Sequence, residues 1–438
     1  MLSTETIPNR CMFVLPKKGR GCRMLTREGQ KYCGEHAIFQ EHNEDRIPCP
    51  NDPKHTVNRR VIRQHLMRCN SRVIEEQWIV KDMNAMVGET KFTAKLDRRA
   101  DEQEIACVLE KLQSCYCLAH DKLLADQAHY EEIDGHLEKN PDLSESKRKH
   151  LVQLSSIIGH LLRVGLLRND SSTCTIELGA GKAQLTYWLT KRAPLSKFLL
   201  IDRSGARNKF DNKALQENPS LNIKRLRCSI EHLNLAELEM LKDVSSCAVC
   251  KHFCGSATDA GIRCLSNGIR SGVVLDGFVL VPCCHHKSRY SEYSGREFLA
   301  QWNMDSESDF AALRHIATWA VCGFSKVQGN RETHTQDQFA DQCDGDVVAE
   351  DSGSIHTEHQ LDIGTTADQG HGSDDAELTP WSPMWKEEMG RRAKVLLEMG
   401  RAQHLASLGF TTQVIEYVPR SVSPENLLIL GFKPRSLS

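Results

Sequence analysis

The stretch CTIELGAGKAQLTYWLTKRAPLSKFLLID, residues 174–202, decides the fold. Its apolar start at 174–178 predicts a buried strand, the glycines that follow predict a tight turn, and the next residues predict a helix through Leu185 and Trp188. KFLLID at 197–202 predicts a second strand. The stretch therefore reads as one strand–turn–helix–strand unit of a parallel sheet.

The same alternation continues on the C-terminal side of this unit. Apolar runs at 244–250 and 275–281 predict two more strands. A helical pattern at 385–408 comes before two further apolar runs, 409–418 and 426–432, which predict a pair of strands. We therefore expect an α/β fold with a Rossmann-like sheet.

The turn after the first strand carries the predicted cofactor site. Glycines let a backbone approach a ligand closely, and an acidic residue at the end of the next strand can accept both hydroxyls of a ribose. The short E-x-G-x-G form fits S-adenosylmethionine better than a dinucleotide. A Rossmann-like oxidoreductase, the alternative, would normally have a third glycine where Ala183 stands. The predicted cofactor-binding residues are Glu177, Gly179, Ala180, Gly181 and Asp202.

Cysteine usage predicts two metal sites near the N-terminus. The chain has 18 cysteines, and because it shows no secretory signal or membrane span, we expect an intracellular protein, in the cytoplasm and/or nucleus, where disulfides are rare. Residues 10–70 have little apolar periodicity and should fold around metal; scattered buried thiols are the alternative. Two sets of four ligands suit closed, structural zinc sites. They are Cys11, Cys22, Cys33 and His36, and Cys49, His55, His65 and Cys69.

Charge is divided unevenly along the chain. Residues 1–72 hold 14 Lys/Arg against 7 Asp/Glu, whereas residues 326–380 hold 2 against 13. The basic part favours a polyanionic partner, with solvated surface charge as the alternative. Residues 326–380 are predicted to be a disordered acidic insertion. The candidate phosphate contacts around the zinc ligands are Lys17, Lys18, Arg20, Arg23, Arg59, Arg60 and Arg63.

Several motifs together resemble those of the eukaryotic tRNA methyltransferase 13 family. Besides the two Cys/His sets, they are IELGAGKAQLTYWL (176–189), KHFCGSATDAGIRC (251–264), PCCHHKSRY (282–290) and SPENLLILGF (423–432). The resemblance covers nearly the whole chain apart from 326–380. It departs at Ala183, where glycine is expected, and at Ser288, where a cysteine often stands.

The resemblance implies a tRNA 2′-O-methyltransferase that uses S-adenosylmethionine. Its target would be the ribose of nucleotide 4 in the acceptor stem of tRNA-Pro, tRNA-Gly and tRNA-His. The expected partner is therefore the tRNA acceptor stem, with no membrane; protein partners are not predicted. One alternative is a zinc-finger methyltransferase that acts on another RNA or on protein. The other is a non-catalytic RNA-binding protein, against which the intact cofactor motif argues.

Methyl transfer from a sulfonium is a direct displacement, for which the enzyme aligns the hydroxyl and helps to remove its proton. Lys251 and His252 follow the predicted strand at 244–250, at the edge where such sheets bind ligands. We expect Lys251 to act as base or orienting cation, with His252 and Asp259 next. A phosphate contact or a surface position is the alternative for Lys251.

A third metal ion is a weaker hypothesis. Cys250, Cys254, Cys264 or the cluster 283–286 could supply ligands. Adjacent side chains diverge, however, so consecutive residues rarely all bind one ion, and Ser288 removes one expected thiol.

Four parts of the chain follow from these patterns. We expect a CCCH-type zinc finger at 1–45, a CHHC-type zinc finger at 46–75 and a helical connector at 76–142. A class I methyltransferase domain would fill 143–438 and contain the acidic insertion at 326–380.

Overall fold

The computed structural model describes residues 10–16, 19–26, 29–40, 43, 45–69, 72, 76–86, 100–203, 209–320 and 380–433. The predicted acidic insertion at 326–380 lies outside the described residues except for Pro380, and so do Lys17 and Lys18.

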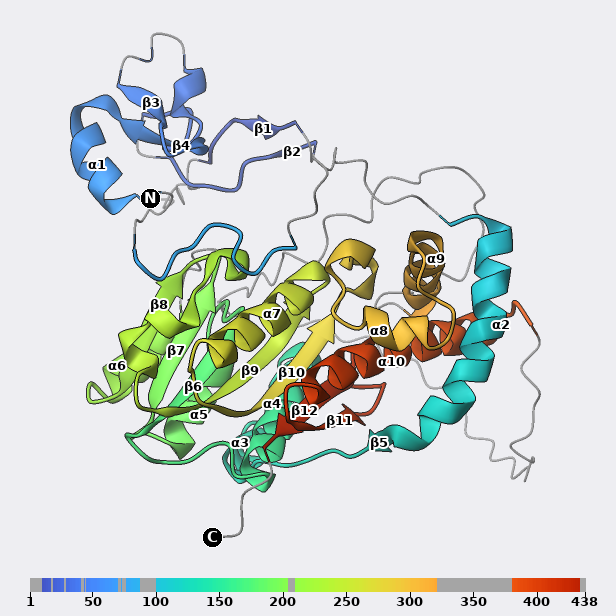
Figure 1. Cartoon of the computed structure of the whole chain (residues 1–438). Helices are drawn as coiled ribbons and strands as arrows, with labels where there is room; N and C mark the ends of the chain where they lie inside the picture. The colour runs from blue at the N-terminus through green and yellow to red at the C-terminus, as the bar shows by residue number, and fades with distance from the viewer. Residues whose placement is uncertain are drawn as a thin grey trace, which may run out of the picture.

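One eight-stranded sheet forms the centre of the molecule (Figure 1), in the order β5-β11-β12-β10-β9-β6-β7-β8. Strands β6 to β10 are parallel, and β12 runs antiparallel between β10 and β11. The bounds are β5 Leu123–Ala125, β6 Thr173–Leu178, β7 Lys197–Asp202, β8 Asn222–Arg227, β9 Ser245–Cys254, β10 Leu275–Cys283, β11 Thr411–Glu416 and β12 Leu427–Phe432. The predicted α/β fold and its C-terminal strand pair are confirmed.

Helices cover both faces of this sheet. Successive residues of a strand therefore pack alternately into two separate hydrophobic cores. Leu199 and Ile201 of β7 belong to one core, whereas Phe198 and Leu200 belong to the other. Such two-sided burial is expected of parallel strands. The first core includes residues of α2 (Glu102–Ala119), α7 (Ser256–Arg270), α9 (Glu307–Ala317) and α10 (Pro383–Ala406). The second includes residues of α3 (Glu131–Lys139), α4 (Glu145–Arg163), α5 (Gln184–Arg192) and α6 (Phe210–Glu217).

The strand order reverses next to β6. From β6 the chain moves outward through β7 to β8 and then returns to the other side of β6 to form β9 and β10. Open parallel sheets bind ligands at the carboxyl ends of the strands where the order reverses. The turn after β6 and the end of β9 meet at this point.

The segment 76–142, predicted to be a helical connector, packs against the central fold in its described parts. Ile79 forms a bridge with Leu233, and α2 buries Val108 and Leu112 in the first core. The short strand β5, in a stretch predicted to be helical, pairs with β11. A sheet edge has unsatisfied hydrogen-bonding groups, which explains why this segment adds a strand instead of remaining a spacer.

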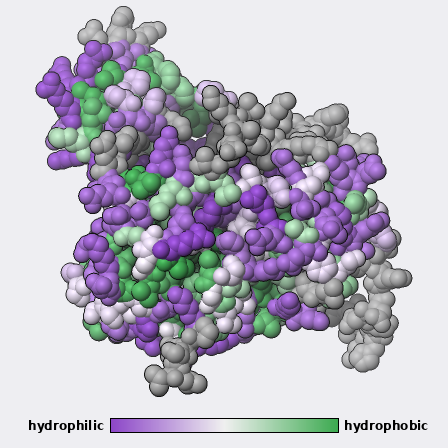
Figure 2. All heavy atoms as spheres, viewed as in Figure 1, coloured by the Kyte–Doolittle hydropathy of each residue, from purple (hydrophilic) through white to green (hydrophobic). Residues whose placement is uncertain are grey.

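The zinc-finger segment is the blue lobe in Figure 1. Its elements are β1 Val14–Leu15, β2 Arg20–Gly21, β3 Arg46–Cys49, β4 Asp52–Asn58 and α1 Ile62–Arg68. Three cysteines form its buried apolar cluster, whereas Met12, Leu25 and Met67 are exposed. Figure 2 accordingly shows hydrophobic residues mixed with hydrophilic ones over the surface of this lobe. A segment with so little core depends on its metal ligands to fold.

The remaining α-helix of the described residues is α8, Arg296–Ala300. Across the described parts of the chain, no helix combines the length and apolar character that crossing a bilayer requires.

Candidate active site and zinc centres

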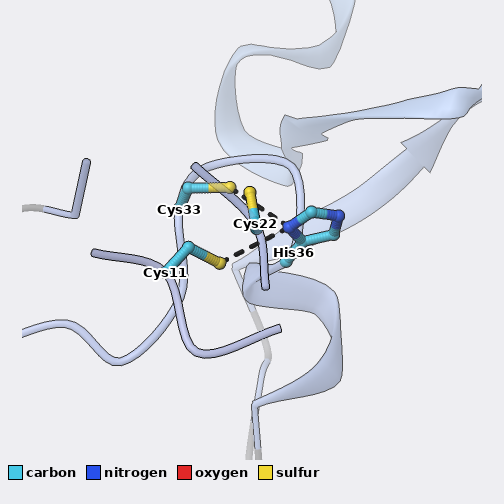
Figure 3. A group of neighbouring side chains, drawn as sticks. All are labelled: Cys11, Cys22, Cys33 and His36. Carbon is cyan, nitrogen blue, oxygen red and sulfur yellow. Dashed lines mark hydrogen bonds between the residues drawn. The ribbon is translucent and has the colours of Figure 1, made fainter. Parts of the chain in front are cut away.

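The first zinc centre gathers ligands from three separate stretches of the lobe (Figure 3). Its four ligand atoms, from Cys11, Cys22, Cys33 and His36, all lie within 4.8 Å of one another. The His36 Nδ1 atom is 3.4 Å from the sulfurs of both Cys11 and Cys33. Phe13 stacks on the His36 ring at 4.0 Å between centroids, which fixes the imidazole plane. Tetrahedral zinc holds such ligands roughly 3.5–3.8 Å apart, so these residues fit the ion.

The second centre combines a β-hairpin with a helix. Cys49 ends β3, His55 lies on β4, and α1 carries His65 and leads to Cys69. The Nε2 atom of His65 is 3.1 Å from the Cys49 sulfur, and Cys69 is 3.5 Å from Nε2 of His55. With four ligands, this site also fits a closed zinc ion.

Hydrogen bonds join the residues that lie beside the two centres. The hydroxyl of Thr56, one residue after His55, donates to the Gly34 carbonyl at 2.6 Å, and its backbone N–H donates to Glu35. The residues next to one centre are thereby tied to the residues next to the other.

The turn after β6 has an unusual backbone. Gly179, Gly181 and Ala183 have φ values of 68°, 49° and 60°, a region that glycine enters at little cost and other residues rarely occupy. A Cβ on Gly179 would lie 3.2 Å from the His252 carbonyl oxygen, so the turn packs directly against β9. A Cβ on Gly181 would meet no described atom within 4 Å. The Gly181 backbone is therefore accessible to a ligand.

Asp202 holds this turn from the end of β7. Its Oδ2 accepts a 2.7 Å hydrogen bond from the Gly181 N–H. Arg225 supports the same residue by donating to the Gly181 carbonyl at 3.1 Å while it pairs with Asp211 at 2.8 Å. The carboxylate lies beside the glycine turn and is partly exposed, as a ribose-binding acidic residue would be.

Glu177 and Ala180 support the turn from inside the fold. Glu177 is 5% exposed and accepts hydrogen bonds from the backbone N–H and the hydroxyl of Thr186 in the first turn of α5. Burial raises the pKa of Glu177 to about 7, against the Thr186 hydrogen bonds, which lower it. Ala180 is buried and donates to the Ile201 carbonyl at 3.0 Å. Both residues therefore support the turn that forms the predicted cofactor site, and their contact with a cofactor stays a prediction.

Lys251 has a partner that the sequence did not reveal. β9 continues to Cys254, beyond its predicted end at 250, so Lys251 is a strand residue. Its side chain is buried, and its Nζ is in short contact with Nδ1 of His150 on α4. Burial first, and then the Lys251 charge, lowers the pKa of His150 to about 3. The imidazole is therefore neutral and accepts a hydrogen bond from the lysine. These two residues lie 101 positions apart.

The other two predicted catalytic residues, His252 and Asp259, lie in different surroundings. His252 is exposed on β9, next to Lys251 and with its carbonyl against Gly179. Asp259 is fully buried, and both of its oxygens bind the Arg401 guanidinium, at 3.1 and 2.8 Å. Asp259 also accepts from the Ser294 hydroxyl at 2.9 Å. Asp259 thus joins α7 to α10, and a catalytic role for it stays a prediction.

The Asp259–Arg401 pair belongs to a larger buried network. Arg401 donates to Glu398 at 2.7 Å, and Glu398 also contacts His285 at 2.7 Å. Although burial alone would lower it, the two carboxylates raise the pKa of Arg401. Ser288, where a cysteine was expected, accepts from Arg401 at 3.0 Å. The Ser288 hydroxyl is thus part of this hydrogen-bond network, which accounts for a serine at a position where a cysteine was expected.

These features together define a class I methyltransferase that carries two zinc fingers: a parallel sheet closed by an antiparallel hairpin, a glycine turn backed by an acidic strand end, and two Cys/His centres. Residues 152–431 match the family described as Methyltransferase TRM13, and the chain belongs to this family. Residues 9–37 match the CCCH zinc finger in TRM13 protein, and residues 46–70 match the U11-48K-like CHHC zinc finger. The predicted family and the two predicted zinc fingers are confirmed.

Curated relatives resemble the chain over almost all of its length. The human tRNA:m(4)X modification enzyme TRM13 homolog is 28% identical, over 98% of this chain and 95% of that protein. The tRNA:m(4)X modification enzyme TRM13 of Eremothecium gossypii is also 28% identical, over 97% of this chain and 95% of that protein. Among solved structures, the plantazolicin methyltransferase BpumL in complex with SAH is 13% identical and covers 48% of this chain and 71% of that one. The TM-score of this match is 0.22.

Proposed function

We propose that this chain transfers a methyl group from S-adenosylmethionine to the ribose 2′-hydroxyl of nucleotide 4 in the acceptor stem of tRNA-Pro, tRNA-Gly and tRNA-His. The observation that carries the proposal is the contact of Gly179 with the His252 carbonyl. It brings a cofactor-type turn and the buried Lys251 to one edge of the sheet. The choice of tRNA rests on the relatives, which are named as tRNA:m(4)X modification enzymes.

The glycine turn fits the proposed cofactor. The backbone of Gly179 and Gly181 would face S-adenosylmethionine, and the Asp202 carboxylate would accept its ribose hydroxyls. Asp202 lies next to Gly181, with their hydrogen bond at 2.7 Å, so both contacts come from one small surface. When bound there, the cofactor supplies a sulfonium methyl group that a nucleophile can attack directly.

Lys251 is the residue proposed to act on the ribose hydroxyl. The neutral His150 ring accepts a hydrogen bond from Lys251 and so fixes the direction of its side chain. A lysine held in this way can orient the hydroxyl oxygen as a cation or take its proton as a base. His252, exposed one position further, faces away from Lys251 along the pleat and is a candidate contact to the RNA.

The zinc lobe supplies a basic surface. Arginine side chains positioned by the two zinc centres are suited to phosphate oxygens, because phosphate contacts dominate nucleic-acid affinity. The exposed ones are Arg20, Arg23, Arg59, Arg60 and Arg63. We propose that this lobe binds the tRNA backbone while the sheet edge holds the target nucleotide.

The proposal is tested by methyl transfer from labelled S-adenosylmethionine to unmodified transcripts of the three tRNAs. The modified nucleotide is mapped by its resistance to alkaline cleavage, and label at nucleotide 4 is expected. Transfer to other RNAs or to protein, with none to tRNA, would favour the alternative substrates. Cofactor binding without any transfer would favour a non-catalytic RNA-binding protein.

Lys251 variants separate its two possible roles. Lys251→Ala should lower turnover by about 10²–10⁴-fold, the usual contribution of a positioned acid or base. Lys251→Arg keeps the charge but cannot accept a proton at ordinary pH; partial recovery indicates an orienting cation, and none indicates a base. Lys242→Ala is the matched control, because Lys242 is exposed and pairs with Glu239. Full activity of Lys251→Ala would refute its role.

A further inference from the structure

Three more thiols meet at the carboxyl edge of the sheet. Cys254 ends β9, Cys283 ends β10, and Cys284 follows immediately. Their sulfur atoms all lie within 4.8 Å of one another. Within the described ranges, the other gatherings of metal-binding side chains this close are the two zinc-finger sets.

The first two thiols are brought together by strand pairing. Cys254 and Cys283 are directly paired in the parallel ladder of β9 and β10, with their sulfurs 3.2 Å apart. The register of this ladder shifts between Leu280 and Pro282, just before Cys283. Such irregularities re-aim the side chains that follow them. The pairing therefore sets two sulfurs side by side at the end of the sheet.

The third thiol is brought in by an unusual backbone. In a continuing strand, Cys284 would point away from Cys283, because successive side chains lie on opposite faces. Instead Cys284 has φ 52° and ψ 48°, a left-handed conformation that residues with a Cβ rarely adopt. The chain turns there, so the two consecutive sulfurs converge instead of diverging. Backbone strain of this kind is kept where a site requires it.

We propose that Cys254, Cys283 and Cys284 bind a third Zn²⁺ ion, in addition to the two zinc fingers. Three thiolates form a soft ligand set that zinc prefers, with Zn–S distances of about 2.3 Å. The fourth position falls to a nitrogen or oxygen ligand. Ser288 does not provide it, because its hydroxyl is buried in the Arg401 network. From the sequence, a metal ion here was less expected because adjacent side chains diverge and because Ser288 replaces a thiol.

A disulfide between Cys254 and Cys283 is the competing interpretation. It would close the two sulfurs to about 2.05 Å and leave Cys284 without a role for its left-handed turn. A metal ion uses all three thiols and therefore accounts for the turn as well.

Such an ion would join the ends of two neighbouring strands close to the proposed reaction site. Cys254 is three positions after Lys251 on β9, and His285, directly after Cys284, contacts Glu398 of the buried network. The ion would thus fix the strand end that carries Lys251 and His252. This is a positioning role, and its test does not depend on catalysis.

Metal content tests the proposal on the full chain. Elemental analysis by plasma mass spectrometry should find three zinc atoms per chain purified under reducing conditions. The double variant Cys254→Ser/Cys283→Ser should hold two. Cys107→Ser, at an exposed position on α2, is the control and should still hold three. Two zinc atoms in the unmodified chain, or three in the double variant, would overturn the proposal.

Thiol labelling tests the same proposal on the unmodified chain, so the result does not depend on whether a variant folds. N-ethylmaleimide followed by peptide mass spectrometry should leave Cys254 and Cys284 unlabelled until a chelator removes zinc, whereas Cys107 should react in both states. Equal labelling of Cys254 with and without chelator would overturn the proposal. A disulfide-linked peptide joining Cys254 to Cys283 in the purified chain would do the same.

Discussion

Replacing Glu177 with glutamine should remove the contribution that ionisation of Glu177 makes to the pH dependence of the free energy of unfolding. Burial raises the pKa of Glu177 from an ordinary 4.5 to about 7. Between these two pH values the folded chain keeps a proton on Glu177 that the unfolded chain releases. The contribution of this proton to the free energy of unfolding is therefore fully present below pH 4.5 and lost as pH rises through 7.

The size of this effect follows from the shift. Each pKa unit corresponds to about 1.4 kcal/mol, so the shift of Glu177 corresponds to about 3 kcal/mol. Glutamine cannot ionise, and every other group is shared by the two proteins. The free energy of unfolding of the natural chain minus that of Glu177→Gln should therefore fall by about 3 kcal/mol between pH 4.5 and 8.

Urea unfolding in zinc-containing buffer, followed by tryptophan fluorescence at a series of pH values, measures this difference. Trp188 lies on α5, the helix that Glu177 supports, and reports on the same region. Glu217→Gln is the control with the opposite sign. The hydrogen bond from Lys191 lowers the pKa of Glu217, so that its contribution is lost as pH falls. A flat or rising difference for Glu177→Gln would refute the assignment of a protonated, buried Glu177.

Substitutions at three other positions have defined outcomes. Asp259→Ala should lower the free energy of unfolding by about 3–5 kcal/mol, because it leaves Arg401 buried without its partner; a loss below about 1 kcal/mol in urea unfolding would contradict this. Ala183→Gly should raise the thermal midpoint and Ala183→Val should lower it, because the φ of 60° favours glycine; the reverse order would disprove the strain argument. Cys49→Ser should remove one zinc atom per chain and weaken tRNA binding, with S-adenosylhomocysteine binding unchanged in calorimetry; an unchanged zinc count would contradict the second centre.

Local patterns were enough to predict the glycine turn and the zinc sets. Gly179, Gly181 and Asp202 belong to one strand–turn–helix–strand unit, so their spacing along the chain fixes their spacing in the fold. The zinc ligands are likewise close in sequence and share one chemical purpose. In both cases the short spacing along the chain restricts the distances between the side chains, and this spacing can be read from one sequence.

Contacts between distant segments could not be predicted in this way. His150 contacts Lys251 only because α4 packs on the sheet. Similarly, Arg401 of α10 donates hydrogen bonds to Asp259. The ion pair of Asp259 with Arg401, which lies 142 positions away, could therefore not be expected from the sequence. The convergence of Cys283 and Cys284 depends on one left-handed residue, a backbone choice that residue types alone do not specify.

The position of β12 has a consequence for how the protein is made. This strand lies between β10 and β11, yet it is one of the last segments of the sheet to be synthesised. Until the ribosome has released residues 427–432, β10 has an open edge and β11 has no neighbour on that side. An open hydrophobic strand edge invites pairing with other chains. The sheet of a nascent chain therefore cannot close before residues 427–432 are made, and a premature stop just before β12 would produce an aggregation-prone protein.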